Sequence, residues 1–417
     1  MKAPDYKAAY RTVMDDHFPA RMEVSFVDGD ARQTLFFEKV SWTINGVEKG
    51  LRYGENPGQE AALYRLVNGN LTLGEATSIE PGRWLASDVE LLQFGKHPGK
   101  INITDADAAL GILRYFDERP CSVIIKHNNP CGVALGSSLA ESYARANMAD
   151  RVAAFGGAIA FNREVDRETA ELVAENYAEV VAAPEYAQGT VEILGRRKNL
   201  RIMRIAAMSR LREYTGLRFV DFKSLMDGGV IAQWSYVPEI RSAADFAPAQ
   251  ATYEGREYRI RRLPTAREAE DLLFGWLVES GVTSNSVIYV RDAVTVGIGT
   301  GEQDRVGVAE IARDKAYRKT ADRICWERHG VPYNELADEK RRTEIDEEVR
   351  ELKGGLNGAC MVSDAFFPKR DGVDVGIREG ITAIVQPGGS LRDFEAIEAC
   401  NEAEVAMVFT GQRSFKH

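Results

Sequence analysis

A lysine and a histidine stand side by side at the end of an apolar run, in the stretch VIIKHNNPCG (residues 123–132). Histidine can accept a proton near neutral pH, and a neighbouring lysine can stabilise developing negative charge or supply a proton. Strands often end in polar residues for structural reasons alone. In open α/β sheets, however, the loops that follow strands carry ligand sites. Lys126 and His127 are therefore the first candidates for acid–base chemistry.

Cys131 follows His127 closely, and a cysteine with a histidine can act as a nucleophile and its base. The structural alternative is a small buried thiol. The segment Asn-Asn-Pro-Cys-Gly predicts a tight, irregular turn after the strand. A Cys-His amidohydrolase or acyltransferase thus stays open as a second class of function.

A zinc site is not expected. Pro130-Cys131 resembles half of a zinc deaminase signature, but Ala134 stands where the second cysteine would be, and no His-x-Glu precedes it. No ligand pair is formed by the five histidines, which are His17, His97, His127, His329 and His417.

Other strand ends carry polar or aromatic residues. The alternating glycines of VGIGTG (296–301) do not fit a dinucleotide fingerprint and predict a strand with close backbone approaches. The segment SDAFFPKRDGVD (363–374) would expose aromatic side chains that suit a flat ligand. In PGGS (387–390), backbone amides could hold an anion. The residues alone favour acid–base or acyl-type chemistry on an anionic, partly flat substrate, without metal or nicotinamide.

Helical and strand patterns alternate from about residue 85, which predicts an α/β fold with a mostly parallel sheet covered on both faces. The first 50 residues read as an N-terminal extension, with a short helix over 5–18 and a β-hairpin around Asp28-Gly29-Asp30. A boundary near residue 246 divides the remainder into subdomains 51–245 and 246–417. The charged run 336–352 predicts a solvated helix or a connector.

The composition narrows the class of protein. The chain has 417 residues and a net charge of −10, which argues against a nucleic-acid partner. Its five cysteines include no Cys-x-x-Cys pair, which is typical of a reduced, intracellular protein. We see no secretory signal and no apolar run long enough to cross a membrane. A cytoplasmic enzyme without a membrane partner is expected.

Taken together, an ordered set of segments over residues 51–417 resembles the AICAR transformylase part of the bifunctional purine-biosynthesis enzyme, whose other part is IMP cyclohydrolase. The segments are LRYGENPGQ, INITDA, IIKHNNPCG, AFGGAIAFN, MDGGVIAQ, SNSV, GIGTGEQDR, SDAFFPKRDGVD, PGGS and the terminal RSFKH. No single one is decisive, but the ordered set is highly specific.

The resemblance implies transfer of a formyl group from 10-formyltetrahydrofolate to the 5-amino group of AICAR. It also implies tandem cytidine-deaminase-like α/β/α units with mixed sheets, and a homodimer with active sites at its interface. Folate would be a cosubstrate, zinc would be absent, and a structural potassium ion is left open. Only 50 residues precede LRYG, so we expect a stand-alone formyltransferase without cyclohydrolase activity. A non-catalytic nucleotide-binding protein is a further alternative.

Site residues follow from the resemblance one position at a time. Lys126 and His127 match its catalytic pair. Asp371 matches a catalytic-site aspartate near the folate, and Asn285 matches an asparagine that contacts the reacting groups of AICAR. The expected substrate-binding residues are Arg52, Tyr53, Asn102, Phe155, Gly156, Glu179, Arg305, Phe366, Pro368, Ser390, Arg413 and His417. The chain departs from the family at Gly58, where a histidine is usual, and at Lys369, where an aromatic residue is common.

Overall fold

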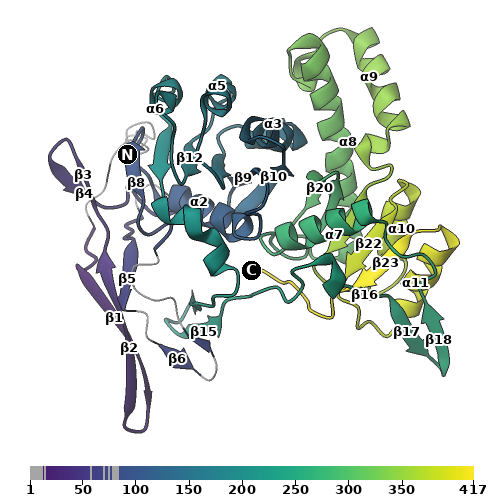
Figure 1. The fold of residues 1–417 in the computed structure, drawn as a ribbon, viewed down its shortest axis with the longest axis horizontal. Helices are drawn as coiled ribbons and strands as arrows, with labels where there is room; N and C mark the ends of the chain where they lie inside the picture. The colour runs from purple at the N-terminus through teal and green to yellow at the C-terminus, as the bar shows by residue number, and fades with distance from the viewer. Residues whose placement is uncertain (1–12, 14–15, 57–58, 69–70, 74–75, 78–83) are drawn as a thin grey trace, which may run out of the picture. The chain divides into compact units, whose positions relative to one another are not determined.

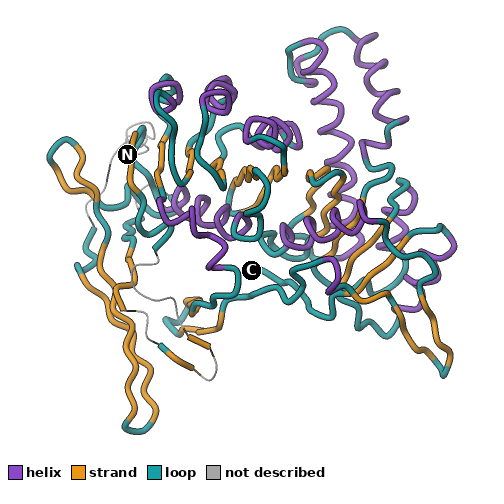
Figure 2. The backbone as a smooth tube through the Cα atoms, in the orientation of Figure 1, coloured by secondary structure: helices purple, strands orange, loops and turns teal. Residues whose placement is uncertain are grey.

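The computed structural model describes residues 13, 16–56, 59–68, 71–73, 76–77 and 84–417. The helix expected over residues 5–18 falls mostly outside them. Helices and strands alternate along most of the described chain, which confirms the predicted α/β class (Figure 2). None of the described helices is both long enough and apolar enough to span a membrane.

Two compact units are assembled from interleaved segments of the chain. The first consists of Met1–Cys121 and Gly156–Val237, and the second of Ser122–Phe155 and Pro238–His417. The segment with the Lys-His pair therefore packs with the C-terminal part of the sequence. The boundary near residue 246, which would separate subdomains 51–245 and 246–417, stays a prediction.

In the first unit, strands follow the order β11-β12-β13-β8. The first three are parallel, and β8 is antiparallel to β13. A separate hairpin pairs β1 with β2 from Arg21↔Glu38 to Asp28↔Ala31. The main elements of the unit (Figure 1) are β1 (Arg21–Asp28), β2 (Ala31–Lys39), β3 (Trp42–Ile44), β4 (Val47–Lys49), β5 (Tyr64–Asn68), β8 (Glu90–Gln93), α2 (Lys100–Leu113), β11 (Ala158–Phe161), α5 (Arg167–Glu175), β12 (Val180–Ala183), α6 (Thr190–Leu194), β13 (Arg201–Arg204), β14 (Val220–Ser224) and β15 (Val230–Trp234).

In the second unit, strands follow the order β16-β23-β22-β21-β19-β20-β10-β9. Strands β21, β22 and β23 are parallel, whereas β19, β20 and β10 run antiparallel to their neighbours. The sheet is therefore mixed, and the prediction of a mostly parallel sheet from the alternating pattern is wrong. Its main elements are β9 (Cys121–Lys126), β10 (Asn129–Leu135), α3 (Leu139–Ala149), α4 (Arg151–Ala154), β16 (Ala247–Pro248), β17 (Gln250–Tyr253), β18 (Arg256–Arg259), α7 (Ala266–Glu279), β19 (Val287–Arg291), β20 (Val294–Gly299), α8 (Arg305–His329), α9 (Glu339–Glu351), β21 (Cys360–Ser363), α10 (Asp371–Arg378), β22 (Ala383–Gln386), α11 (Asp393–Glu402) and β23 (Ala406–Phe409).

The turn after β9 differs from the sequence-based expectation. His127 and Asn128 both have positive φ, at 55° and 61°, and they alone join β9 to β10. Positive φ at both central residues matches the two-residue turns that suit the twist of a hairpin, and His and Asn tolerate this conformation better than most residues. Cys131 therefore lies within a strand, not in an irregular turn.

Close backbone contacts between helices and strands depend on glycine. A Cβ on Gly297 would lie 2.3 Å from the Ala312 oxygen, and one on Gly299 would lie 2.3 Å from the Val308 oxygen. Both oxygens belong to α8, so the alternating glycines allow this helix to lie directly on β20. This confirms the structural explanation of VGIGTG.

Helices α8 and α9 lie side by side in the second unit (Figure 1). The predicted solvated helix over 336–352 is present as α9, and most of its residues are exposed or half-buried. Ile345 and Val349 are buried, and they join Ile324 and Cys325 of α8 in a small apolar cluster. Helix α8 continues to His329, and α9 covers its second half.

Candidate functional site

Most of the expected site residues of the second unit come from one edge of its sheet. The parallel strands β21, β22 and β23 end at this edge. Strand β19 starts at this edge. Its first residue, Val287, pairs with Ser363 at the end of β21 and with Gly299 at the end of β20. Strand β10 is antiparallel to β20, so the β9–β10 turn reaches the same edge. The residues that this topology gathers are Lys126, His127, Asn285, Arg305, Phe366, Pro368, Asp371, Ser390, Arg413 and His417.

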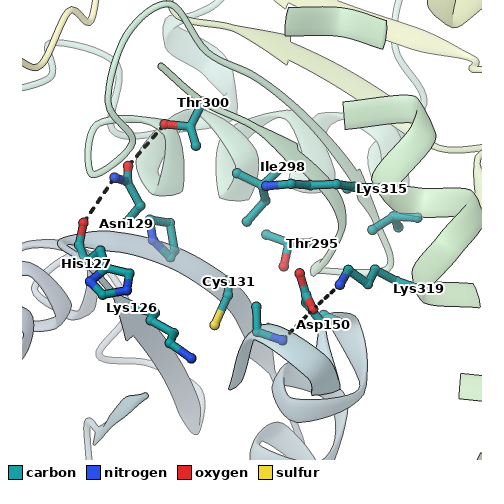
Figure 3. Close-up of a pocket in the computed structure, with 15 residues that line it drawn as sticks. Lys126, His127, Asn129, Cys131, Asp150, Thr295, Ile298, Thr300, Lys315 and Lys319 are labelled. Carbon is teal, nitrogen blue, oxygen red and sulfur yellow. Dashed lines mark hydrogen bonds and ion pairs between the residues drawn. The ribbon is translucent and has the colours of Figure 1, made fainter. Parts of the chain in front are cut away.

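The Lys126–His127 turn is held by polar contacts on several sides. The Asn129 carboxamide oxygen accepts hydrogen bonds from the Thr283 backbone N–H at 2.8 Å and from the Thr300 hydroxyl at 3.2 Å. Its nitrogen donates to the His127 carbonyl oxygen at 3.3 Å (Figure 3). The Lys416 amine donates to the Asn128 carbonyl oxygen at 3.0 Å. The turn is therefore tied to the chain before Asn285 and to the C-terminal segment.

The two members of the pair have different surroundings. The Lys126 amine is half-buried and donates to the Phe155 carbonyl oxygen at 2.5 Å. The expected residue Phe155 thus meets Lys126 through its backbone, while its own side chain is 63% exposed. His127 is exposed at the tip of the turn, where its imidazole is accessible to a ligand. The pair therefore combines an anchored cation with an open proton acceptor.

Arg305 is buried beneath Asn285. Its guanidinium donates to the Asn285 side-chain oxygen at 2.7 Å and to the Ser363 hydroxyl at 3.1 Å, and it forms a close ion pair with Asp364. Asp364 is fully buried. We expected the Arg305 guanidinium to bind the nucleotide, but protein groups already occupy it. It holds the side-chain amide of Asn285, which we expect at the reacting atoms.

A second buried carboxyl group belongs to this cluster. Glu279 is fully buried at the end of α7 and accepts a hydrogen bond from the Ser286 hydroxyl at 2.5 Å. Burial, and then the nearby Asp364 carboxylate, raise the pKa of Glu279 well above its ordinary value. Sequence reasoning missed both acids. Asp364 had a signal, because it directly follows a buried strand next to the aromatic pair.

The aromatic and glycine-rich loops differ in part from the expectation. Phe366 is 40% exposed, but Phe367 is fully buried, and its N–H donates to the Gln386 side chain at 2.9 Å. In PGGS, the Gly389 and Ser390 N–H groups donate to the Asp393 carboxylate at 2.7 and 3.0 Å. These amides are already satisfied by the protein's own anion, so this loop does not provide the expected anion site.

The remaining expected residues of this unit lie at its surface. Pro368 is exposed, and Asp371 is the first residue of α10, where its carboxylate accepts from the Gly372 N–H at 2.9 Å. Arg413 places its guanidinium 4.1 Å from the centre of the Phe415 ring, and the His417 ring meets the same ring edge-on at 5.7 Å. These side chains remain available at the sheet edge.

The first unit brings together a separate set of the expected residues. Arg52 lies 4.4 Å from the centre of the Tyr53 ring, and Asn102 donates to the Glu179 carboxylate at 3.1 Å. The Arg201 guanidinium also contacts Glu179, at 3.3 Å, and is almost fully buried. Burial lowers the pKa of Arg201 to about 10.

Sequence reasoning missed Arg201, because nothing in its short strand indicates a contact with Glu179. Gly156 makes a different kind of contact. Its N–H donates to the Tyr177 carbonyl oxygen at 2.8 Å, and its φ of 75° favours glycine.

A cavity of about 280 Å³ extends from the Lys126–His127 turn between β10, β20 and α8 (Figure 3). Cys131 lies in its wall, and its thiol donates to the Ile124 carbonyl oxygen at 3.5 Å. Burial, and then the Asp150 carboxylate, raise the pKa of this thiol to about 12. Such a thiol is protonated at neutral pH and is poorly suited to nucleophilic attack.

Within the described ranges, no group of three or more His, Cys, Asp or Glu side chains is arranged to hold a metal ion. The charged side chains that line the cavity are Lys126, Asp150, Lys315 and Lys319, and the His127 imidazole lines it as well. The site can therefore supply cations and a proton acceptor from its own side chains.

Comparisons with known proteins give a consistent result. Residues 2–315 match the family described as "AICARFT/IMPCHase bienzyme". A protein of Caldicellulosiruptor saccharolyticus, named "Bifunctional purine biosynthesis protein PurH", is 34% identical over 416 residues, which cover 100% of this chain and 66% of that protein. Proteins of the same name from Aquifex aeolicus and Acidithiobacillus ferrooxidans are 37% and 36% identical over 88% and 94% of this chain. The chain spans 59–66% of the length of these relatives.

Proposed function

Because the chain belongs to the AICARFT/IMPCHase bienzyme family, we propose that it transfers a formyl group from 10-formyltetrahydrofolate to the 5-amino group of AICAR. The products are formyl-AICAR and tetrahydrofolate, in the biosynthesis of purines. The observation that carries the proposal is the anchored Lys126–His127 turn at the same sheet edge as Asn285. This arrangement supplies a proton acceptor, a cation and an amide for an acyl transfer that needs no covalent enzyme intermediate.

In the proposed mechanism, His127 removes a proton from the attacking amine. The amine of an aminoimidazole carboxamide is a poor nucleophile, so base assistance during attack accelerates the reaction by about 10²–10⁴. Lys126 either stabilises the oxyanion that forms on the formyl group or protonates the departing folate nitrogen. Asn285, fixed by Arg305, orients the reacting groups of AICAR, and Asp371 acts beside the folate.

The other expected residues bind the two reactants. Arg52 and Tyr53 suit a phosphate and a nucleotide, because a guanidinium matches the geometry of phosphate oxygens. Phe366 offers an exposed aromatic face to a flat ring. We further propose that the protein works as a cytoplasmic homodimer whose subunits complete each other's sites.

We also propose that this chain acts as a stand-alone formyltransferase without IMP cyclohydrolase activity. The segments that resemble the transformylase lie within residues 51–417, and the β1–β2 hairpin contributes none of the proposed site residues.

The test supplies the purified chain with AICAR and 10-formyltetrahydrofolate and follows the release of tetrahydrofolate. We expect release that requires both reactants, and no conversion of added formyl-AICAR to IMP. A folded protein that binds AICAR but never releases tetrahydrofolate would instead be the non-catalytic nucleotide-binding protein. Formation of IMP would contradict the stand-alone proposal only.

The Cys-His alternative makes a different prediction at Cys131. Because the thiol is protonated and hydrogen-bonded to Ile124, we expect Cys131→Ala to retain formyl transfer within about threefold of the wild-type rate. The measurement is the same release assay, with the fold of the variant checked by circular dichroism. A loss of 10³-fold or more, of the order seen when a catalytic nucleophile is removed, would favour the thiol enzyme.

A further inference from the structure

The cavity beside the Lys126–His127 turn contains more cationic than anionic side chains. Lys315 and Lys319 are one turn apart on α8, so both side chains leave the same face of the helix. The Lys319 amine forms an ion pair of 2.7 Å with Asp150. Asp150 also caps α4, because its carboxylate accepts from the Ala153 N–H at 2.9 Å. Asp150 therefore pairs with Lys319, and it is the one carboxylate among the described residues that line the cavity.

Lys315 is the least compensated of these amines. In the part of the chain that the structure describes, no hydrogen bond or ion pair engages its ammonium group, although the side chain is half-buried. Figure 3 shows it extending from α8 over the cavity toward Ile298. Burial lowers the pKa of Lys315, and the nearby Asp150 carboxylate only partly opposes this effect. Lys126, which also lines the cavity, donates to the neutral carbonyl group of Phe155.

We propose that this cavity is a binding subsite for a small oxyanion, a carboxylate or a phosphate group, held by Lys315 with Lys126 and Lys319 around it. An anion would supply the missing counter-charge and so recover part of the cost of keeping the ammonium groups away from water. The lysine amine is a compact point charge that suits phosphate and carboxylate oxygens. Apolar walls that include Ala149, Ala153 and Ile298 strengthen the attraction, because they exclude water.

The inference goes beyond the proposed formyl transfer, which assigns no role to Lys315, Lys319 or Asp150. The cavity is also lined by Lys126 and His127, so an anion bound there shares the space with the proposed acid–base pair. The anion is either a free ion or the anionic group of a larger reactant. Both sources have the same chemistry and are distinguished by competition.

The test is isothermal titration calorimetry of the full chain with inorganic phosphate and, separately, with formate. Sodium chloride keeps the ionic strength constant. We expect saturable binding of at least one anion, weakened about tenfold or more by Lys315→Met, because the variant loses a hydrogen bond between charged groups. Methionine keeps an unbranched apolar stem and removes the charge. Lys315→Arg should retain binding.

The matched control is Lys340→Met on α9, whose side chain is 88% exposed and should leave binding unchanged. If Lys315→Met fails to fold, Lys319→Met serves instead, because it frees the Asp150 carboxylate to repel the anion. No saturable binding of either anion by the wild-type protein would overturn the proposal. Equal binding by the folded Lys315→Met variant would do the same.

Competition identifies the source of the anion. If AICAR or folate displaces the bound phosphate or formate, the subsite holds part of a reactant, and if neither does, it holds a free ion. Both results support the subsite. The titrations involve no turnover, so a failure here is distinguishable from a failure of the proposed formyl transfer.

Discussion

Replacing His127 should lower the rate of formyl transfer by about 10²–10⁴-fold, the usual contribution of a general base. Asparagine is the substitution that disturbs the backbone least, because His127 has a φ of 55° and asparagine tolerates that conformation better than alanine. The variant His127→Asn should therefore keep the β9–β10 turn while losing the proton acceptor. We expect the loss mainly in kcat, measured by tetrahydrofolate release, with the affinity for AICAR little changed.

Two companion variants sharpen this experiment. His329→Ala, in the last turn of α8 and outside the proposed site, is the matched control and should retain full activity. Lys126→Met should reduce kcat by about 10²–10³-fold if Lys126 stabilises the oxyanion. A His127→Asn variant that releases tetrahydrofolate at the wild-type rate would remove the base from the proposed mechanism.

Replacing Arg305 should have the largest effect on stability. Arg305→Leu leaves the fully buried Asp364 carboxylate without its guanidinium, and loss of one partner of a buried ion pair costs about 3–5 kcal/mol of unfolding free energy. It also removes the hydrogen bond that holds Asn285. We therefore expect the urea midpoint to fall, and formyl transfer to fall with it even under conditions where the variant is folded.

Glu279→Gln is the matched control in the same buried cluster. Because the pKa of Glu279 is raised in the folded protein, its carboxyl group keeps its proton to a higher pH there. In the unfolded chain the same group loses the proton once the pH exceeds the ordinary pKa of a glutamate. The contribution of Glu279 to stability is therefore full at acidic pH and decreases as the pH rises. Glutamine cannot ionise and can still accept the hydrogen bond from Ser286.

We expect the Glu279→Gln variant to unfold near the wild-type midpoint at about pH 5 and to be at least as stable at about pH 8. Urea unfolding at the two pH values measures the difference. An Arg305→Leu variant as stable as the wild type would show that Asp364 does not depend on the guanidinium. If the Glu279→Gln variant were much less stable than the wild type at about pH 8, that result would contradict a protonated Glu279 in the folded protein.

Much of the fold could be predicted because its signals are local. The runs Cys121–Lys126, Val180–Ala183 and Cys360–Ser363 are short and mostly apolar, and all are strands with mostly buried side chains. Helix α7 begins at a capping box formed by Thr265 and Glu268, two residues close together in the sequence. These patterns depend on the backbone and its nearest neighbours along the chain.

The sequence by itself determined the α/β class and, through its ordered segments, the family and the Lys126–His127 pair. Only the tertiary structure revealed the two-residue turn that carries His127, the use of Arg305 within the protein, and the lysine-lined cavity between β10, β20 and α8. Lys315 and Lys319 share one face of α8, and only the structure shows which groups that face meets. These features depend on contacts between residues far apart in the chain, and local patterns do not encode which distant groups compensate a buried charge.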